Sequence, residues 1–400
     1  MAIGSSSSVW LSFSLQYRGN RGKPRVECWD AAMEDVGMTS TGMPSQSLNT
    51  IGSSGFVDWD FAKATGRLLA QAGPRVVPGQ AAMVVASLRS AAERSRGPVA
   101  ETARMHSEGG QPALIVDRPG WIDANVDSMR SMLDPVITSI LARRKSPDPA
   151  SSLVAGVGGK VTGAEVGTLT AFLSGKILGQ YDLAPDGIPR LLLVAPNVLH
   201  TESELGVDPA DFRLWICLHE ETHRVQFTAV PWLRRHVIDS VRSLSLDLAP
   251  DPDHLGDQLR QIAQNLPSAL RSGGNGLADV FASAEQRAEL AKIGAIMSLL
   301  EGHADVVMDD VGPAVVPSVG HIRSKFQQRR QDVHGLDKIL RRLLGLEAKM
   351  RQYADGAAFV RAVTAKVGTD GFNAVWTSPE TLPAPGEIEN PLAWVQRVHG

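Results

Sequence analysis

Residues 208–227 read DPADFRLWICLHEETHRVQF, and this stretch predicts the central helix of the fold. Asp208 is a favoured residue for the N-cap of a helix, and Pro209 suits the first helical position. A helix that begins there places His219 and His223 four residues apart on one face, about 6 Å apart. The apolar residues around them indicate that this helix is largely buried.

The same helix carries the residues of a metal-dependent hydrolytic site. Two neutral imidazoles at this spacing can share one Zn²⁺, with each nitrogen about 2.0–2.1 Å from the ion. Glu220 follows the first histidine, and in the His-Glu-x-x-His pattern this carboxylate takes a proton from the attacking water. We therefore predict His219 and His223 as zinc ligands and Glu220 as the general base. The alternative is a histidine pair satisfied by hydrogen bonds on a buried helix.

A second helical stretch offers the third ligand. Residues 299–309 read LLEGHADVVMD, which places Glu301 and Asp305 four residues apart on one helix face. Apolar residues flank both carboxylates, and a buried carboxylate needs a partner such as a metal ion. Glu301 would complete a His₂Glu site whose fourth position is open to water. Asp305 would accept the second ring N–H of a ligand histidine.

His303 is the alternative third ligand. It lies two positions from Glu301 and therefore points elsewhere on a regular helix, so we favour Glu301. A zinc hydrolase also needs a donor for the oxyanion that forms in the transition state. The candidates are His303, Tyr181, Tyr353 and Arg224, and the sequence does not select one of them.

The composition narrows the metal chemistry. The 400 residues include only two cysteines, Cys28 and Cys217, which excludes a disulfide scaffold and a cysteine-rich zinc or iron–sulfur site. A site built from histidine and carboxylate is the type that remains. Hydrophobic residues make up 43% and charged residues 21%, as expected for a folded chain with a sizeable core.

Charge and hydropathy argue against two classes of partner. The net charge is −3, so no overall basic excess points to nucleic acid or to anionic membranes. Residues 321–351 are locally basic, but apolar residues at helical spacing make these charges the solvated side of an amphipathic helix. No apolar run approaches the roughly 20 residues of a membrane span. The apolar residues 9–13 lack a preceding basic region, so they do not read as a signal peptide, and we expect a cytoplasmic protein.

The helix and strand signals predict a mainly α fold with minor β structure. Residues 191–194, LLLV, are the clearest strand signal. We expect a helix break at Pro98 and helices at about 58–71, 79–96, 99–107, 119–145, 167–179, 209–228, 232–248, 255–270, 283–311, 322–365 and 391–398. We divide the chain into a disordered extension (1–55), an N-terminal helical lobe with a short strand near 190–195 (56–200), and a catalytic lobe with an irregular C-terminal segment (201–400).

Five stretches resemble the zincin-like metallopeptidase family of actinobacteria, which is also described as coenzyme F420 biosynthesis-associated. They are HEETHRVQF (219–227), LEGHAD (300–305), WTSPETLP (376–383), LGQYD (178–182) and LLLVAPN (191–197). The resemblance covers most of residues 56–398 and implies a zincin-like, largely helical fold with two lobes around an active-site helix. It carries the two histidines and Glu220 over directly, and Glu301 through the wider Glu-x-x-x-Asp pattern.

The residues and the resemblance together predict a zinc-dependent hydrolase, in the first place a metallopeptidase that acts on a peptide. One alternative is a non-catalytic, zinc-stabilised binding or scaffold protein, and another is a metal-dependent hydrolase of a small molecule. An intact Glu220 argues against the non-catalytic protein, because a site without turnover has no use for a base. The resemblance implies no particular substrate, and the sequence leaves the oligomeric state open.

Overall fold

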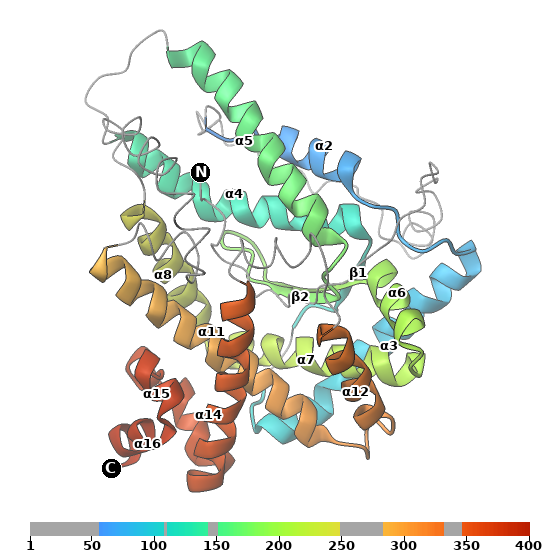
Figure 1. Cartoon of the computed structure of the whole chain (residues 1–400), viewed down its shortest axis with the longest axis vertical. Coiled ribbons are helices and arrows are strands. Elements are labelled where there is room, and N and C mark those ends of the chain that lie inside the picture. Colours follow the sequence, from blue (N-terminus) through green and yellow to red (C-terminus); the bar gives the residue numbers. More distant parts are fainter. Residues whose placement is uncertain (1–55, 108–109, 143–150, 249–282, 332–345) are drawn as a thin grey trace.

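The computed structural model describes residues 56–107, 110–142, 151–248, 283–331 and 346–400 (Figure 1). Helices dominate these residues, which confirms the mainly α prediction. The longer helices are α2 (Trp59–Leu69), α3 (Pro78–Ala103), α4 (Arg118–Ala142), α5 (Ser151–Ser174), α6 (Ala195–Leu205), α7 (Pro209–Ala229), α8 (Leu233–Asp247), α11 (Ala284–Val311), α12 (Val319–Gln331) and α14 (Leu346–Phe372). The shorter elements that follow are η1 (Asn373–Trp376), η2 (Pro379–Thr381), α15 (Pro385–Glu389) and α16 (Pro391–His399).

A small sheet lies between the helices. Its strands are β1 (Leu114–Val116), β2 (Gly179–Asp182) and β3 (Arg190–Val194), in the order β1-β3-β2. β1 runs parallel to β3, and β2 runs antiparallel to it with Gly179 opposite Leu193. β3 confirms the predicted strand, whereas the sequence did not predict β1 and β2. In Figure 1, α4 lies on one side of the sheet and α7 on the other.

α7 is the central helix and begins as predicted. Asp208 Oδ1 accepts a hydrogen bond from the backbone N–H of Asp211 at 2.9 Å, and Pro209 is the first helical residue. Every residue from Leu214 to Phe227 is buried, because α3, α11 and the strands β2 and β3 pack around this helix. Polar side chains on such a helix have little access to water, so each needs a partner from the protein or a bound ligand.

In two regions, the structure around proline residues differs from the prediction. Pro98 was predicted to separate two helices but lies inside α3, which continues to the buried Ala103. The buried contacts of this last turn stabilise the helix by more than the loss of one backbone hydrogen bond costs. In the C-terminal segment, predicted to be mostly irregular, prolines begin short helices: Pro379 in η2, Pro385 in α15 and Pro391 in α16. Proline suits this first position because the N–H that it lacks has no helical partner there.

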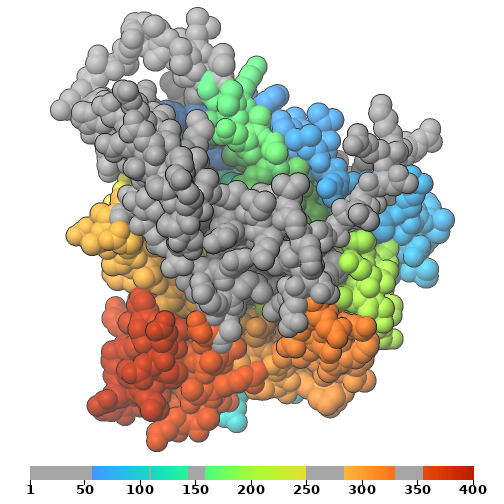
Figure 2. All heavy atoms as spheres, in the orientation of Figure 1, coloured from blue at the N-terminus to red at the C-terminus, as the bar shows by residue number. Residues whose placement is uncertain are grey.

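The C-terminal helices form one end of the molecule. In Figure 2, the C-terminal part of the chain (red) lies at the end opposite α2 and α5 (blue and green). α16 confirms the predicted helix near 391–398. α14 packs along α11, so the C-terminal part of the chain contacts the helix that carries Glu301.

Some of the sequence predictions concern residues that the structure does not describe. These are the extension 1–55, the helix at about 255–270 and residues 332–345 of the basic stretch. The predicted boundary between two lobes, near residue 200, falls inside α6, and the division into lobes stays a prediction. Along the described residues, no helix is both long enough and apolar enough to cross a membrane.

Candidate metal centre

Two helices bring the predicted ligand residues together. His219 and His223 lie on α7, and Glu301 faces them from α11. The two Nε2 atoms are 3.1 Å apart, and Glu301 Oε2 lies 3.5 Å from His219 Nε2 and 3.7 Å from His223 Nε2. All three side chains are buried, and their ligand atoms lie within 4.8 Å of one another. The cluster can therefore hold one metal ion.

The spacing of these atoms suits a tetrahedral ion. Ligand atoms about 2.0–2.1 Å from a tetrahedral centre lie roughly 3.3 Å from one another. The three observed distances, 3.1, 3.5 and 3.7 Å, lie on both sides of this value. The second oxygen of Glu301, Oε1, is buried and has no hydrogen-bond partner among the described residues. Two nitrogens and one carboxylate oxygen form the donor set of an open hydrolytic zinc site, so the residues fit such an ion.

Gln226 sets the tautomer of His223. Its Nε2 donates to the backbone oxygen of Leu300 at 2.9 Å, which turns its Oε1 towards His223 Nδ1 at 3.0 Å. Because an amide oxygen only accepts, His223 Nδ1 must carry the proton and donate. In the neutral ring that binds a metal, His223 Nε2, the atom that faces His219 and Glu301, is then the nitrogen with the free lone pair. Sequence reasoning missed this residue, and its only signal is its place three positions after His223 on the same helix face.

His303 lies behind Gln226 and outside the ligand cluster. Its Nδ1 accepts from Gln226 Nε2 at 3.0 Å, and its ring packs against Phe372 and Trp376 at centroid distances of 5.3 and 5.4 Å. Burial, together with the charge of His223, lowers the pKa of His303 to about 3, so this ring stays neutral. The structure places His303 where it supports Gln226, and it does not bring His303 to the metal position as a third ligand.

Among the described residues, Glu220 has no polar partner. Both carboxylate oxygens are buried and make no hydrogen bond to the described residues. Burial raises the pKa of Glu220 to about 8; the charge of His223 opposes this rise, and the charge of Glu301 adds to it. A carboxyl group with such a pKa can exchange a proton near neutral pH.

The charges of His223 and Glu301 stabilise each other. Burial lowers the pKa of His223, but the neighbouring Glu301 carboxylate outweighs burial and raises it above the ordinary value. Burial raises the pKa of Glu301, but the positive charge of His223 and hydrogen bonds from both histidines lower it below the ordinary value. The cluster is thus a buried ion pair whose proton a metal ion would replace.

Asp305 is less well placed than its predicted role requires. Its Oδ1 lies 3.8 Å from His219 Nδ1, which is within range of an ion pair but too long for a hydrogen bond. Its side chain is 35% exposed, in contrast to the buried ligand cluster. Orientation of His219 by Asp305 therefore stays a prediction.

The remaining oxyanion candidates have other contacts. Tyr181 stacks on Phe227 with a centroid distance of 5.7 Å, and burial raises its pKa to about 12. Arg224 forms a buried ion pair with Glu221, in which its Nε donates to Oε2 at 2.7 Å. The side chain of Tyr353 lies outside the part of the chain that is described. None of these contacts selects a donor, so the oxyanion donor stays an open prediction.

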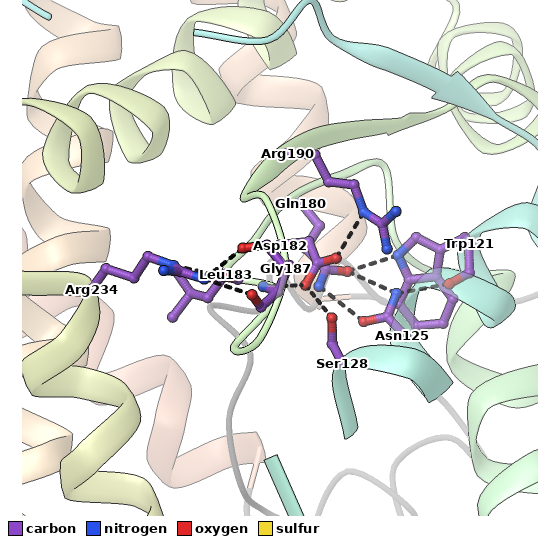
Figure 3. Close-up of polar contacts among 10 residues, drawn as sticks. Trp121, Asn125, Ser128, Gln180, Asp182, Leu183, Gly187, Arg190 and Arg234 are labelled. Carbon is purple, nitrogen blue, oxygen red and sulfur yellow. Dashed lines mark hydrogen bonds and ion pairs between the residues drawn. The ribbon is translucent and has the colours of Figure 1, made fainter. Parts of the chain in front are cut away.

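Strand β2, next to α7, is fixed by buried polar contacts with α4 (Figure 3). Gln180 Oε1 accepts from Trp121 Nε1 at 2.8 Å and from Asn125 Nδ2 at 3.2 Å. Gln180 Nε2 returns a hydrogen bond to Asn125 Oδ1 at 2.9 Å. Asp182, at the other end of the strand, accepts from Ser128 Oγ at 2.6 Å. These bonds join both ends of β2 to α4.

Arg234 of α8 holds the loop that follows β2 (Figure 3). Its guanidinium donates to four backbone oxygens, those of Leu183 at 2.8 Å, Ala184 at 2.6 Å, Pro185 at 3.2 Å and Gly187 at 3.0 Å. Ala184 has a φ of +40°, a left-handed conformation that a residue with a side chain seldom adopts. The four bonds to Arg234 stabilise this turn.

Comparisons with known proteins place the chain in a family of metallopeptidases. A family model described as zincin-like metallopeptidase matches residues 57–395. A crystal structure described as a candidate hydrolase with a novel fold, from Chloroflexus aurantiacus, is similar with 29% identity and a TM-score of 0.61. The match covers 86% of this chain and 99% of that one. No curated protein matches the chain.

Proposed function

The chain belongs to the zincin-like metallopeptidase family, and on that premise we propose that it is a zinc-dependent hydrolase that cleaves peptides. The observation that carries the proposal is the buried cluster of His219, His223 and Glu301, with the unpaired carboxylate of Glu220 beside it. A structural role alone explains the cluster poorly, because it leaves a buried glutamate with no partner among the described residues. The hydrolase described from Chloroflexus aurantiacus supports the same class of reaction.

Each residue of the site would have a separate role in hydrolysis. His219, His223 and Glu301 would hold the zinc ion, and Gln226 keeps His223 Nε2 free to bind it. Zinc supplies Lewis-acid polarisation of a carbonyl group and lowers the pKa of water. Glu220 accepts the proton of the attacking water and returns it to the leaving amine. Without a metal, burial raises the pKa of Glu220 to about 8. The charge of a zinc ion beside it would lower this pKa towards the range in which one group can accept a proton and return it.

Burial favours a second candidate, a zinc-stabilised protein without turnover. His219 is 4% exposed, His223 0% and Glu301 3%, whereas catalytic zinc sites keep one position open to water or substrate. A closed site of this kind would bind zinc and stabilise the fold without hydrolysis. Replacement of Glu220 distinguishes the two candidates, because it abolishes hydrolysis in the first and leaves no activity to lose in the second.

The test is a comparison of wild type with Glu220→Gln. Zinc content is measured by elemental analysis, and hydrolysis is measured with a quenched-fluorescence peptide library. We expect both proteins to hold about one zinc per chain and only the wild type to cleave the library. Glu204→Gln, a change at an exposed glutamate of α6, is the matched control and should behave as wild type.

Each other outcome has a defined meaning. A zinc-loaded wild type that cleaves no library peptide refutes the peptidase and supports the non-catalytic candidate. If a small ester or amide is cleaved instead, and this activity is also lost in Glu220→Gln, the protein is a small-molecule hydrolase. Wild type that binds no zinc refutes the site itself.

A further inference from the structure

Strand β2 meets α7 at Gly179, a residue that has no side chain. A Cβ atom built on Gly179 would lie 2.6 Å from Cγ of Glu220, and 2.7 Å from both Cδ and Oε1. Carbon atoms in favourable contact lie about 3.5–4.0 Å apart. The Glu220 carboxylate therefore occupies the space that any side chain at position 179 would need.

The backbone conformation does not explain this glycine. The described glycines with a positive φ are Gly110, Gly206, Gly312 and Gly368, and Gly179 is not among them. Position 179 has an ordinary strand backbone that any residue can adopt, with Leu193 of β3 opposite. What glycine provides here is the absence of a side chain.

Hydrogen bonds hold the strand on both sides of Gly179. Leu178 O accepts a hydrogen bond from the backbone N–H of Val194 at 2.9 Å, immediately before Gly179. Gln180, immediately after it, is joined to Trp121 and Asn125. With both neighbours of Gly179 fixed, an added methyl group would displace Glu220 and leave the strand in place.

Within the described parts of the chain, no other contact fixes the Glu220 carboxylate. Its two oxygens make no hydrogen bond to the described residues, so packing alone orients the group. From this geometry we propose that Gly179 is a positioning residue, whose bare Cα forms the surface on which the Glu220 carboxylate rests. The inference rests on the proposed function, in which Glu220 is the base. A base that is misplaced by about 1 Å can lose about 100-fold in rate.

The first test is the turnover of Gly179→Ala. With zinc loaded, we expect about one zinc per chain as in wild type, and a loss of roughly 100-fold in kcat on the library peptide that wild type cleaves fastest. Gly187→Ala is the matched control, because a Cβ there, in the loop after the same strand, would meet Ala184 alone, at ordinary distances of 3.5 Å from its Cβ and 3.8 Å from its backbone oxygen. Full activity of Gly179→Ala, with activity lost in Glu220→Gln, overturns the inference and leaves the proposed function intact.

The second test needs no substrate. The melting temperature Tm of the zinc-loaded protein is compared for wild type, Gly179→Ala, Glu220→Ala and the double variant. Overpacking costs stability only while the Glu220 side chain is present, so Gly179→Ala should lower Tm by roughly 2 to 8 °C in wild type. In the Glu220→Ala background its effect should vanish, because the methyl group then enters the space left by the glutamate.

These four proteins form a double-mutant cycle, which tests the contact between Gly179 and Glu220 without any activity assay. Equal changes of Tm in the two backgrounds overturn it, since Gly179 would then not act through Glu220. If Gly179→Ala fails to fold, the double variant should still fold, and its failure is equally decisive against the inference. If wild type cleaves nothing, the proposed function fails, and the cycle still tests the contact between Gly179 and Glu220.

Discussion

Once its metal is stripped by a chelator, Glu220→Gln should gain stability relative to wild type as the pH rises. The pKa of Glu220 is about 8, against an ordinary value of 4.5. Between these two values the folded protein retains a proton that the unfolded chain releases, so the free energy of unfolding of wild type falls as pH rises. Glutamine has nearly the same shape and does not titrate, so the variant lacks this loss.

The size of the effect follows from the two pKa values. One pKa unit corresponds to about 1.4 kcal/mol, so the difference between about 8 and 4.5 amounts to about 5 kcal/mol at high pH. Between pH 5 and pH 8 about 3 to 4 kcal/mol of this should develop. The buried amide of glutamine also lacks partners, but that cost is the same at every pH. The prediction is therefore the slope and not the absolute difference.

Guanidinium unfolding with chelator present, at pH 5, 6, 7 and 8, measures this slope. We expect the free energy of unfolding of Glu220→Gln to gain on wild type by about 1 kcal/mol per pH unit between pH 5 and pH 8. Glu204→Gln should follow wild type throughout. A difference between Glu220→Gln and wild type that stays constant with pH would falsify the view that Glu220 is a buried, unpaired carboxyl group.

Three further changes test other parts of the site. Glu301→Gln removes the anionic ligand and should weaken zinc binding by at least about 100-fold in competition with a chromophoric chelator; unchanged affinity would exclude Glu301 as a ligand. Gln226→Met removes the acceptor of His223 Nδ1 and should weaken zinc binding about 10- to 100-fold, measured in the same way, whereas an unaltered value would show that the tautomer needs no support. Arg234→Ala leaves four backbone oxygens without their donor and should lower the free energy of unfolding by about 2–4 kcal/mol in urea; a loss below about 0.5 kcal/mol would contradict its role in the loop.

The sequence predicts well what depends on neighbouring residues along the chain. Asp208 and Pro209 mark the start of α7, and a helix from that start puts His219 and His223 on one face. The apolar residues around Glu301 indicate a buried carboxylate, and the structure brings this carboxylate to the histidines. These features follow from helix geometry and hydrophobicity, which are local properties of a sequence.

The sequence does not predict what depends on a second element. β1 and β2 have three and four residues, and their strand character comes from pairing with β3 and not from their composition. Gln226 acquires its role from Leu300 and His303 on another helix. Gly179 acquires its role from Glu220. The wrongly predicted helix break at Pro98 has the same origin, because packing of the following turn decides whether the helix continues past this residue.

Under the proposed function, the placement of the metal ligands on two helices far apart in the sequence has a consequence for when the chain can bind the ion during synthesis. When the ribosome has made the chain only as far as α7, the two histidines form an incomplete site that would hold zinc weakly. Glu301 appears only after a long intervening segment. Phe372 and Trp376, which pack against His303 behind the site, appear later still. Tight binding of the ion would therefore wait until α11 has been made, and a chain truncated before residue 372 would lack the aromatic side chains that pack behind the site.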